Sequence, residues 1–268
     1  MRRPLSVLLF SSAIYLLPVA TATQQPVQSA VPVRDPQAVL TLTQALNAAG
    51  GASAISTVQD FTATGNITYY WAGEEVTGTV TIRGARPDQF RLDAQLPNGV
   101  RSWCVNAGQG TIKEANGKQS RIPLHSGANL GSLTFPYGPL FQALIDTSYS
   151  IELLGQESVG GHQLARIRLR PNYPTDLDPS GTLQKWSTRE YLIDSSTFAV
   201  VTLSLVARSN DSPVREYQQE IAFSDYRLVS GVLFPFTIAE TISAQKTWVA
   251  QLNSVSFNSG LSDSDFRF

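Results

Sequence analysis

The sequence predicts a mainly β (α+β) fold, in which a curved antiparallel sheet, or incomplete β-barrel, of about eleven strands is covered by two or three short helices. Three observations predict it. Apolar and polar residues alternate over many short segments, as they do in strands with one buried face. Gly-, Asn- and Pro-containing turns join neighbouring segments closely enough for antiparallel pairing. Helical spacing is confined to a few places, and no repeat or linker divides the chain, so we expect one domain over residues 35–268.

The N-terminal end is typical of an exported protein. Residues 1–22 combine a basic start, an apolar run and a small-x-small sequence that ends at Ala22, which predicts a signal peptide cleaved near Ala22. An N-terminal membrane anchor is the alternative, although the apolar run is short. Residues 23–34 show no periodicity and predict a flexible leader. The expected location is therefore the periplasm.

Helices are predicted at three places. Asp35 is a suitable N-cap, and Pro36 suits the first helical position. The helix that follows carries one apolar stripe and ends at the glycine pair 50–51; the stripe consists of Val39, Leu42, Leu46 and Ala49. A short helical turn over 52–57 and a helix over 138–146 complete the set.

Strands account for most of the remaining chain. In the first half, alternation runs from Phe61 to Ala115, with hairpin turns at 97–99 and 116–117. In the second half, strands resume at Tyr149, turn at 160–161, and form a hairpin around 194–196. The clearest run covers 216–257, with a turn in which Gly231 can take positive φ. The stretches 122–137 and 171–186 break the pattern and are predicted to be long loops that act as lids.

Composition and motifs exclude several classes of function. The formal net charge is −1 without a basic run, which argues against nucleic-acid binding. Cys104 is the single cysteine and lies inside a predicted strand, where a small buried side chain is expected. His125 and His162 lack metal-ligand spacing, and Asp176, Asp178 and Asp211 lack the pattern of a calcium loop. We therefore predict no catalytic residue, no metal, no cofactor and no enzymatic activity.

The pattern leaves more apolar strand surface than the few helices can cover. The sheet must either curl and fill its own interior or enclose an apolar chamber. A chamber for acyl chains is the first interpretation, and a filled core is the alternative. Glu240 shares the face of Phe236 and Ile238, so it is expected at the mouth of the chamber or at a change of register. The predicted ligand-binding residues are apolar side chains on the inward faces and on the covering helix: Trp71, Phe90, Leu92, Phe141, Leu144, Phe223, Phe236 and Trp248.

Several of these motifs together resemble the exported lipoprotein-localisation-factor superfamily, the LolA/LolB-like fold. They are the helix that begins at Asp35-Pro36, the turn 154–161 before the strand with Ile167 and Leu169, the hairpin at 191–194, and the closing unit from Phe223 to Pro235. The resemblance covers about residues 35–266. It implies an incomplete antiparallel barrel capped by helices that binds acyl chains. The chain has no lipid-attachment cysteine near Ala22, and in this respect it resembles the soluble carrier branch of the family. We match no position to the family's cavity-gating arginine.

The leading hypothesis is an exported, non-enzymatic carrier of an apolar ligand in the cell envelope. Lipid or lipoprotein acyl chains are the expected ligands, and envelope membrane proteins are the expected partners for loading and unloading. An envelope interaction or regulatory module with the same fold and no ligand is an alternative. An outer-membrane β-barrel that ends at Phe268 is a further one.

Overall fold

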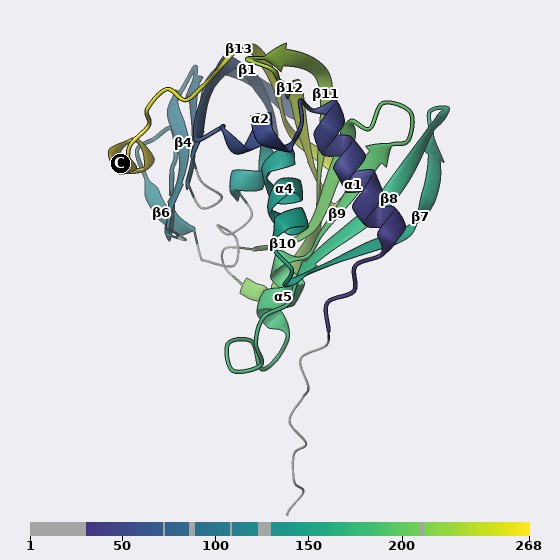
Figure 1. Cartoon of the computed structure of the whole chain (residues 1–268). Helices are drawn as coiled ribbons and strands as arrows, with labels where there is room; N and C mark the ends of the chain where they lie inside the picture. Colours follow the sequence, from purple (N-terminus) through teal and green to yellow (C-terminus); the bar gives the residue numbers. More distant parts are fainter. Residues whose placement is uncertain (1–30, 72, 86–88, 108, 123–129, 210–211) are drawn as a thin grey trace, which may run out of the picture.

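The computed structural model describes residues 31–71, 73–85, 89–107, 109–122, 130–209 and 212–268. They contain thirteen strands in one antiparallel sheet, in the order β6-β5-β4-β3-β2-β1-β13-β12-β11-β10-β9-β8-β7 (Figure 1). The first half of the sheet consists of β1 (Asp60–Trp71), β2 (Glu74–Ala85), β3 (Gln89–Leu96), β4 (Gly99–Asn106), β5 (Gln109–Lys113) and β6 (Gln119–Ile122). The second half consists of β7 (Tyr149–Val159), β8 (His162–Pro171), β9 (Arg189–Asp194), β10 (Val200–Ser209), β11 (Ser212–Val229), β12 (Val232–Ile242) and β13 (Gln245–Phe257).

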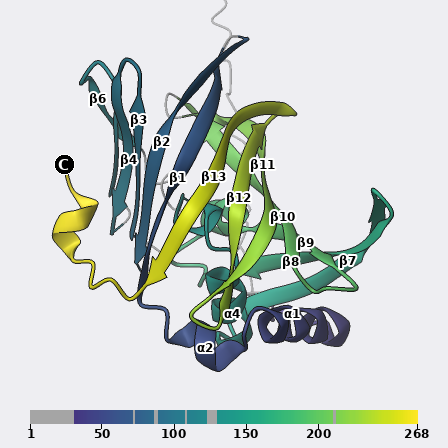
Figure 2. The same ribbon diagram turned by 90° about the horizontal axis from the view of Figure 1, so that it is seen from above.

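The sheet is curved and open. Pairing of β1 with β13 joins the two halves in the middle, and β6 and β7 form its two edges. Figure 2 shows the strands as a curved wall with the helices at one end. The predicted mainly β fold is thus confirmed, with thirteen strands in place of about eleven. The four-residue β6 is too short for its alternation to be recognised in the sequence.

The chain crosses from one edge to the other through η1 (Leu130–Leu133) and α4 (Tyr137–Ile145). Figure 1 shows α4 inside the curve of the sheet. The inner face is apolar because strand residues alternate: Ile67 is buried between Gly78 and Ala250, whereas its neighbour Asn66 is exposed. This crossing places a helix over the apolar face, as a two-layer fold requires.

The N-terminal helices form as predicted. α1 (Pro36–Ala48) begins at Asp35, whose carboxylate accepts a hydrogen bond of 2.9 Å from the Ala38 amide. α2 (Ala52–Ser56) follows directly and leads into β1. The end of α1 is fixed to the sheet, since the Leu233 amide donates to the Ala49 carbonyl at 2.9 Å. The helices are thereby held at the open end of the sheet.

Replacing Gly50 by alanine is expected to destabilise the fold by about 3 kcal/mol. Gly50 has φ +116°, and a Cβ there would lie 2.1 Å from the Gly231 carbonyl oxygen. Gly51 is the matched control, because it also has positive φ (+90°) but no atom within 4 Å of an added Cβ. Gly51→Ala should cost only about 1 kcal/mol. Urea unfolding measures both, and equal losses would contradict the close approach to Gly231.

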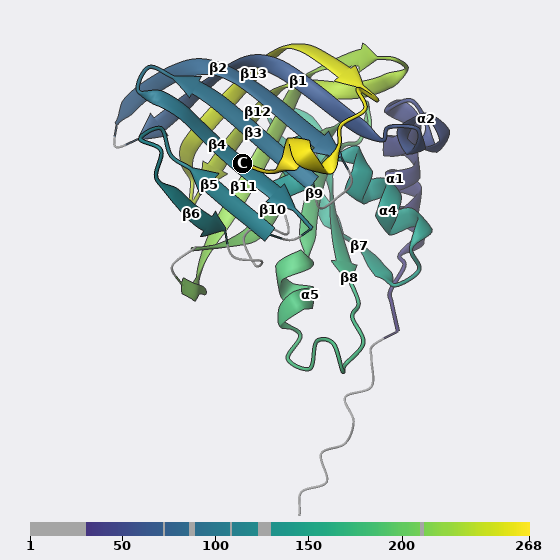
Figure 3. The same cartoon turned by 90° about the vertical axis from the view of Figure 1, so that its left-hand side faces the viewer.

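The two predicted long loops contain regular structure. α5 (Thr182–Ser187) lies inside 171–186, where the Asp178 carboxylate accepts a bond of 2.8 Å from the Gln184 amide. In 122–137, Ile122 belongs to β6 and η1 follows at 130, while residues 123–129 lie outside the described part. The chain after β13 forms η2 (Asp263–Phe266), which lies over β3 and β4 (Figure 3). Whether the two loops act as lids stays a prediction.

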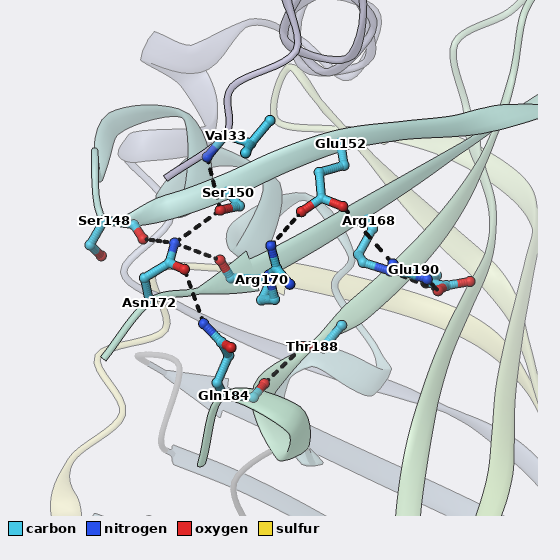
Figure 4. Close-up of polar contacts among 10 residues, drawn as sticks. All are labelled: Val33, Ser148, Ser150, Glu152, Arg168, Arg170, Asn172, Gln184, Thr188 and Glu190. Carbon is cyan, nitrogen blue, oxygen red and sulfur yellow. Dashed lines mark hydrogen bonds and ion pairs between the residues drawn. The ribbon is translucent and has the colours of Figure 1, made fainter. Parts of the chain in front are cut away.

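The outer face of the second half carries an ion-pair ladder. β8 alternates inward Ile167 and Leu169 with outward arginines, which pair with glutamates of β7 and β9 (Figure 4). Arg168 Nη2 lies 2.7 Å from Glu190, and Arg170 Nη2 lies 2.8 Å from Glu152. α5 packs beside this ladder through Gln184, which donates to Asn172 at 3.0 Å. The segment 172–187 therefore covers outer strand surface.

The predicted signal peptide lies outside the described residues, as does the leader up to residue 30. The end of the leader is described: Val33 and Asp35 exchange backbone hydrogen bonds with Ile151 at 2.7 and 2.9 Å, so they extend the sheet beside β7. No helix in the described ranges is long and apolar enough to cross a membrane.

Candidate functional site

A cavity of about 290 Å³ lies between α4, α2 and the ends of several strands. Its wall is mostly apolar and comes from segments that are far apart in the sequence. The residues that line it are Ile55, Ser56, Val58, Gln59, Asp60, Phe61, Gly84, Ala85, Gln89, Phe135, Gly138, Pro139, Phe141, Gln142, Tyr149 and Arg189. The cavity therefore opens where the helices meet both halves of the open sheet.

An aromatic cluster forms one wall. The Phe135 ring stacks on Phe234, with ring centroids 5.6 Å apart and planes 8° apart. Phe61 lies 5.3 Å from Phe234, and Phe257 lies 6.0 Å from it. Phe135 comes just before α4, whereas the other three rings belong to β1, β12 and β13. The cluster thus anchors the start of α4 to the middle of the sheet and supplies apolar surface to the cavity.

The other end of α4 is held by Arg34. One guanidinium nitrogen donates to the carbonyls of Ala143 and Asp146 at 3.1 and 3.2 Å, and the other donates to Leu144 at 2.9 Å. These carbonyls have no partner inside the helix, because they belong to its last turn. A positive charge is also favourable at a helix C-terminus. Arg34 therefore fixes the helix that covers the cavity.

The cavity has one basic end. Arg189, at the start of β9, and Tyr149, at the start of β7, both line it. Burial raises the pKa of Tyr149, and the charge of Arg189 opposes this shift. Tyr191 lies two residues further along β9 and is wholly buried. Burial raises its pKa too, again against the charge of Arg189, and its hydroxyl has no hydrogen-bond partner in the described part of the chain.

A second polar cluster occupies the opposite end of the inner face. The Arg101 guanidinium lies 5.1 to 5.2 Å from the ring centroids of Tyr69, Trp71 and Trp103 and pairs with Glu114 at 2.9 Å. These contacts fill this end of the inner face with side chains.

Glu240 lies in the core, where it is 2% exposed. Its carboxylate accepts hydrogen bonds from Gln219 and Thr247. It is therefore a paired buried acid. Burial raises its pKa, and these two donors oppose the shift.

Glu240→Gln is expected to flatten the pH dependence of stability above the ordinary glutamate pKa of 4.5. Because the pKa is raised in the folded state, the native protein binds more protons than the unfolded chain in this range, so stability falls as pH rises through it. The variant has no proton to lose. Urea midpoints between pH 4.5 and 7 measure the effect. Parallel pH profiles for the two proteins would contradict the assignment.

The predicted ligand-binding residues fall in different places. Phe141 lines the cavity, and Leu144 lies on the same helix, partly buried. Trp71 is 37% exposed and stacks on Tyr69 at 4.8 Å, away from the cavity. Phe236 is buried with the Arg227 guanidinium 4.3 Å above its ring. The remaining four pack in the hydrophobic core: Phe90, Leu92, Phe223 and Trp248.

Several cavity residues were not predicted. Phe61 carried a strand signal, but alternation alone does not say which inward residue borders an open space. Arg189, which lines the cavity, carried no signal, and neither did Arg34, which holds α4 through partners more than a hundred positions away. Their roles depend on the position of α4.

The residues considered for chemistry occupy structural positions. Cys104 is buried, and burial raises its pKa to about 11, which disfavours the reactive thiolate. His162 Nδ1 lies 2.8 Å from Asp194, whose carboxylate also caps the hairpin through the Ser196 and Thr197 amides. His125 and Asp211 lie outside the described residues. The described ranges contain no group of three side chains suited to a metal.

The open, curved sheet with helices over its inner face is a LolA-like fold. No protein-family model and no curated protein matches the chain. Among solved structures, the chain is similar to a domain named for outer-membrane lipoprotein sorting from Vibrio parahaemolyticus, at 14% identity and a TM-score of 0.51, over 85% of this chain and 95% of that one.

Two further solved structures show the same likeness. A LolA superfamily protein from Nitrosomonas europaea matches at 12% identity and a TM-score of 0.51, over 86% of this chain and 97% of its own. A DUF1329 family protein from Desulfovibrio piger matches at 15% identity and a TM-score of 0.52, over 85% of this chain and 96% of its own. At such identities the likeness shows the fold alone, and this is the fold that the sequence motifs predicted.

Proposed function

We propose that this chain is an exported, non-enzymatic carrier that binds an apolar ligand of the cell envelope in the cavity beneath α4. The observation that supports it best is the cavity itself: about 290 Å³ of space beside a covering helix, with more apolar than polar surface in its wall. Ligand sites are typically concave and apolar with few polar groups, and this cavity lies near the lower limit of their usual size of roughly 300 Å³.

The ligand that fits this wall is a lipid or lipoprotein acyl chain. Each buried methylene contributes about 0.8 kcal/mol, so burial of a chain of a dozen carbons contributes about 10 kcal/mol before the cost of association. The likeness to a lipoprotein-sorting domain is consistent with such a cargo. In this proposal the protein acts in the periplasm after cleavage near Ala22, and membrane proteins of the envelope load and unload it.

Titration of the mature chain with cis-parinaric acid, a fluorescent fatty acid, tests the proposal. A saturable increase in fluorescence with one site per chain is expected at micromolar concentration. An unsaturable or absent increase would reject a ligand-binding function and favour an envelope interaction module with a filled interior.

A further inference from the structure

We propose that Gly84 sets the longest alkyl chain that the cavity beneath α4 accepts, because its lack of a side chain leaves room for the ring of Phe61 outside that cavity. The inference rests on the proposed function, since it concerns the size of the ligand in the same cavity. The contact between these two residues of neighbouring strands carries it.

Gly84 and Phe61 lie opposite each other on two strands, and both line the cavity. Phe61 of β1 is the antiparallel partner of Gly84 of β2, so the two positions share one face of the sheet. Two residues before Gly84 is Ile82, and two residues after Phe61 is Ala63. Both of these neighbours are wholly buried, which identifies the shared face as the inner one. The pair is therefore part of the inner wall of the cavity.

The ring of Phe61 occupies the space in which a side chain at position 84 would lie. A Cβ added to Gly84 would be 2.3 Å from Cε1 of this ring, 2.7 Å from Cζ and 3.2 Å from Cδ1. All three distances are shorter than the optimal separation of about 3.5–4.0 Å between carbon atoms. Any side chain at position 84 would therefore displace the ring.

The backbone itself does not require glycine here. Gly84 lies inside β2 and is not among the residues with positive φ, so an alanine could adopt its conformation. A glycine within a strand often marks the close approach of another group. At Gly84 that group is the ring of Phe61. The glycine therefore serves the position of this ring.

A displaced ring would move into the cavity, because its other sides are occupied. The centroid of the Phe61 ring lies 5.3 Å from that of Phe234 and 6.2 Å from that of Phe135, within the aromatic cluster that anchors α4. Phe234 is wholly buried and leaves no space for the ring on its side. The open space beside Phe61 is the cavity. A side chain at position 84 would therefore reduce the volume that a ligand can fill.

The place of the pair within the cavity links this volume to chain length. At one end of the cavity, β2 and β3 supply Gly84 and Gln89 to the wall. At the other end, β7 and β9 supply Tyr149 and Arg189. An extended alkyl chain that fills the cavity would run from one end to the other. A ring that enters at the first end would exclude the last carbons of a long chain and leave a short chain unaffected.

Displacement of cis-parinaric acid from the protein by saturated fatty acids, from octanoate to hexadecanoate, tests the inference. In the wild type, affinity should rise with chain length and level off once the cavity is filled. Gly84→Ala should level off at a shorter chain. Its affinity for the longest chain that still gains affinity in the wild type should fall about tenfold, the equivalent of nearly two buried methylene groups. Its affinity for octanoate should stay the same.

Two further variants show whether the effect passes through the ring. Phe61→Leu should shift the levelling-off to a longer chain, because leucine is smaller than phenylalanine. In the double variant Gly84→Ala/Phe61→Leu, the added methyl group no longer meets a ring, so this protein should bind every chain as Phe61→Leu does. Additive effects of the two changes would overturn the inference. If Gly84→Ala fails to fold, the double variant should still fold, and its failure to do so would overturn the inference as well.

Gly110→Ala is the matched control. Gly110 of β5 lies opposite Ile122 of β6, and a Cβ added to it would be 2.6 Å from Cβ of Ile122. Neither residue belongs to the described wall of the cavity. Gly110→Ala should therefore lower the urea midpoint without changing the dependence of affinity on chain length. A loss of stability alone would not distinguish the two glycines, whereas the dependence on chain length does.

The outcomes separate this inference from the proposed function. If Gly84→Ala shows the same dependence on chain length as the wild type, the inference is overturned and the carrier function remains intact. If neither cis-parinaric acid nor any of the fatty acids binds the wild type, the proposed function itself is rejected.

Discussion

Replacing Gly138 by leucine is expected to weaken uptake of an apolar ligand at least tenfold without lowering the stability of the fold. Gly138 lies in the first turn of α4 and lines the cavity. A Cβ at this position would meet only a ring carbon of Phe135, at an ordinary contact distance of 3.8 Å. The added leucine atoms would therefore take space that the ligand needs. Leucine also favours a helix over glycine by about 0.8 kcal/mol, so the variant should be at least as stable.

The control for this variant is Gly138→Ala, which gains the same helix preference but adds a single carbon. Displacement of cis-parinaric acid measures affinity, and urea unfolding measures stability. Unchanged affinity in Gly138→Leu, with the stability gain observed, would show that ligand binds somewhere other than beneath α4.

Replacing Arg34 by alanine is expected to lower the free energy of unfolding by about 3 kcal/mol, because charge-assisted hydrogen bonds to four carbonyls are lost. The last turn of α4 would then have unpaired carbonyls. Hydrogen exchange at residues 140–145 should accelerate more than exchange in the central strands β1 and β13. Faster ligand release should accompany it, since α4 covers the site.

Arg121→Ala provides the comparison for Arg34, because this side chain is exposed on β6. Arg121→Ala should change the free energy of unfolding by no more than about 0.5 kcal/mol. Arg34→Lys should recover only part of the loss, since an ammonium lacks the planar fork that reaches several carbonyls. If hydrogen exchange in α4 is as slow in the Arg34→Ala protein as in the wild type, Arg34 does not hold the last turn of this helix.

Local signals in the sequence predict most of the fold. The Asp35 cap, the turn at Gly231 and the alternation of Phe61, Ala63 and Ile67 each depend on neighbours within a few residues, and each forms as expected. α5 and η2 escaped prediction because these short helices, six and four residues long, lie in stretches that contain Gly, Ser and Asp and show no apolar periodicity.

The candidate site is harder to predict, because it depends on where the crossing segment lies. Alternation places Phe90 and Trp248 on the inward face, yet it does not show that other side chains cover them there. Phe141 borders the cavity because α4 is tied at one end by Phe135 and at the other by Arg34. These ties join residues about a hundred positions apart, as Phe135 and Phe234 or Arg34 and Leu144 are. Only the folded chain reveals them.

The most direct test of the proposed carrier function is native mass spectrometry of the protein isolated from its host, followed by organic extraction. We predict a bound mass that extracts as lipid, with one ligand per chain, and its loss in Gly138→Leu. A clean apo mass in the wild type, together with no uptake of added cis-parinaric acid, would contradict the carrier function and indicate an interaction module with a filled interior.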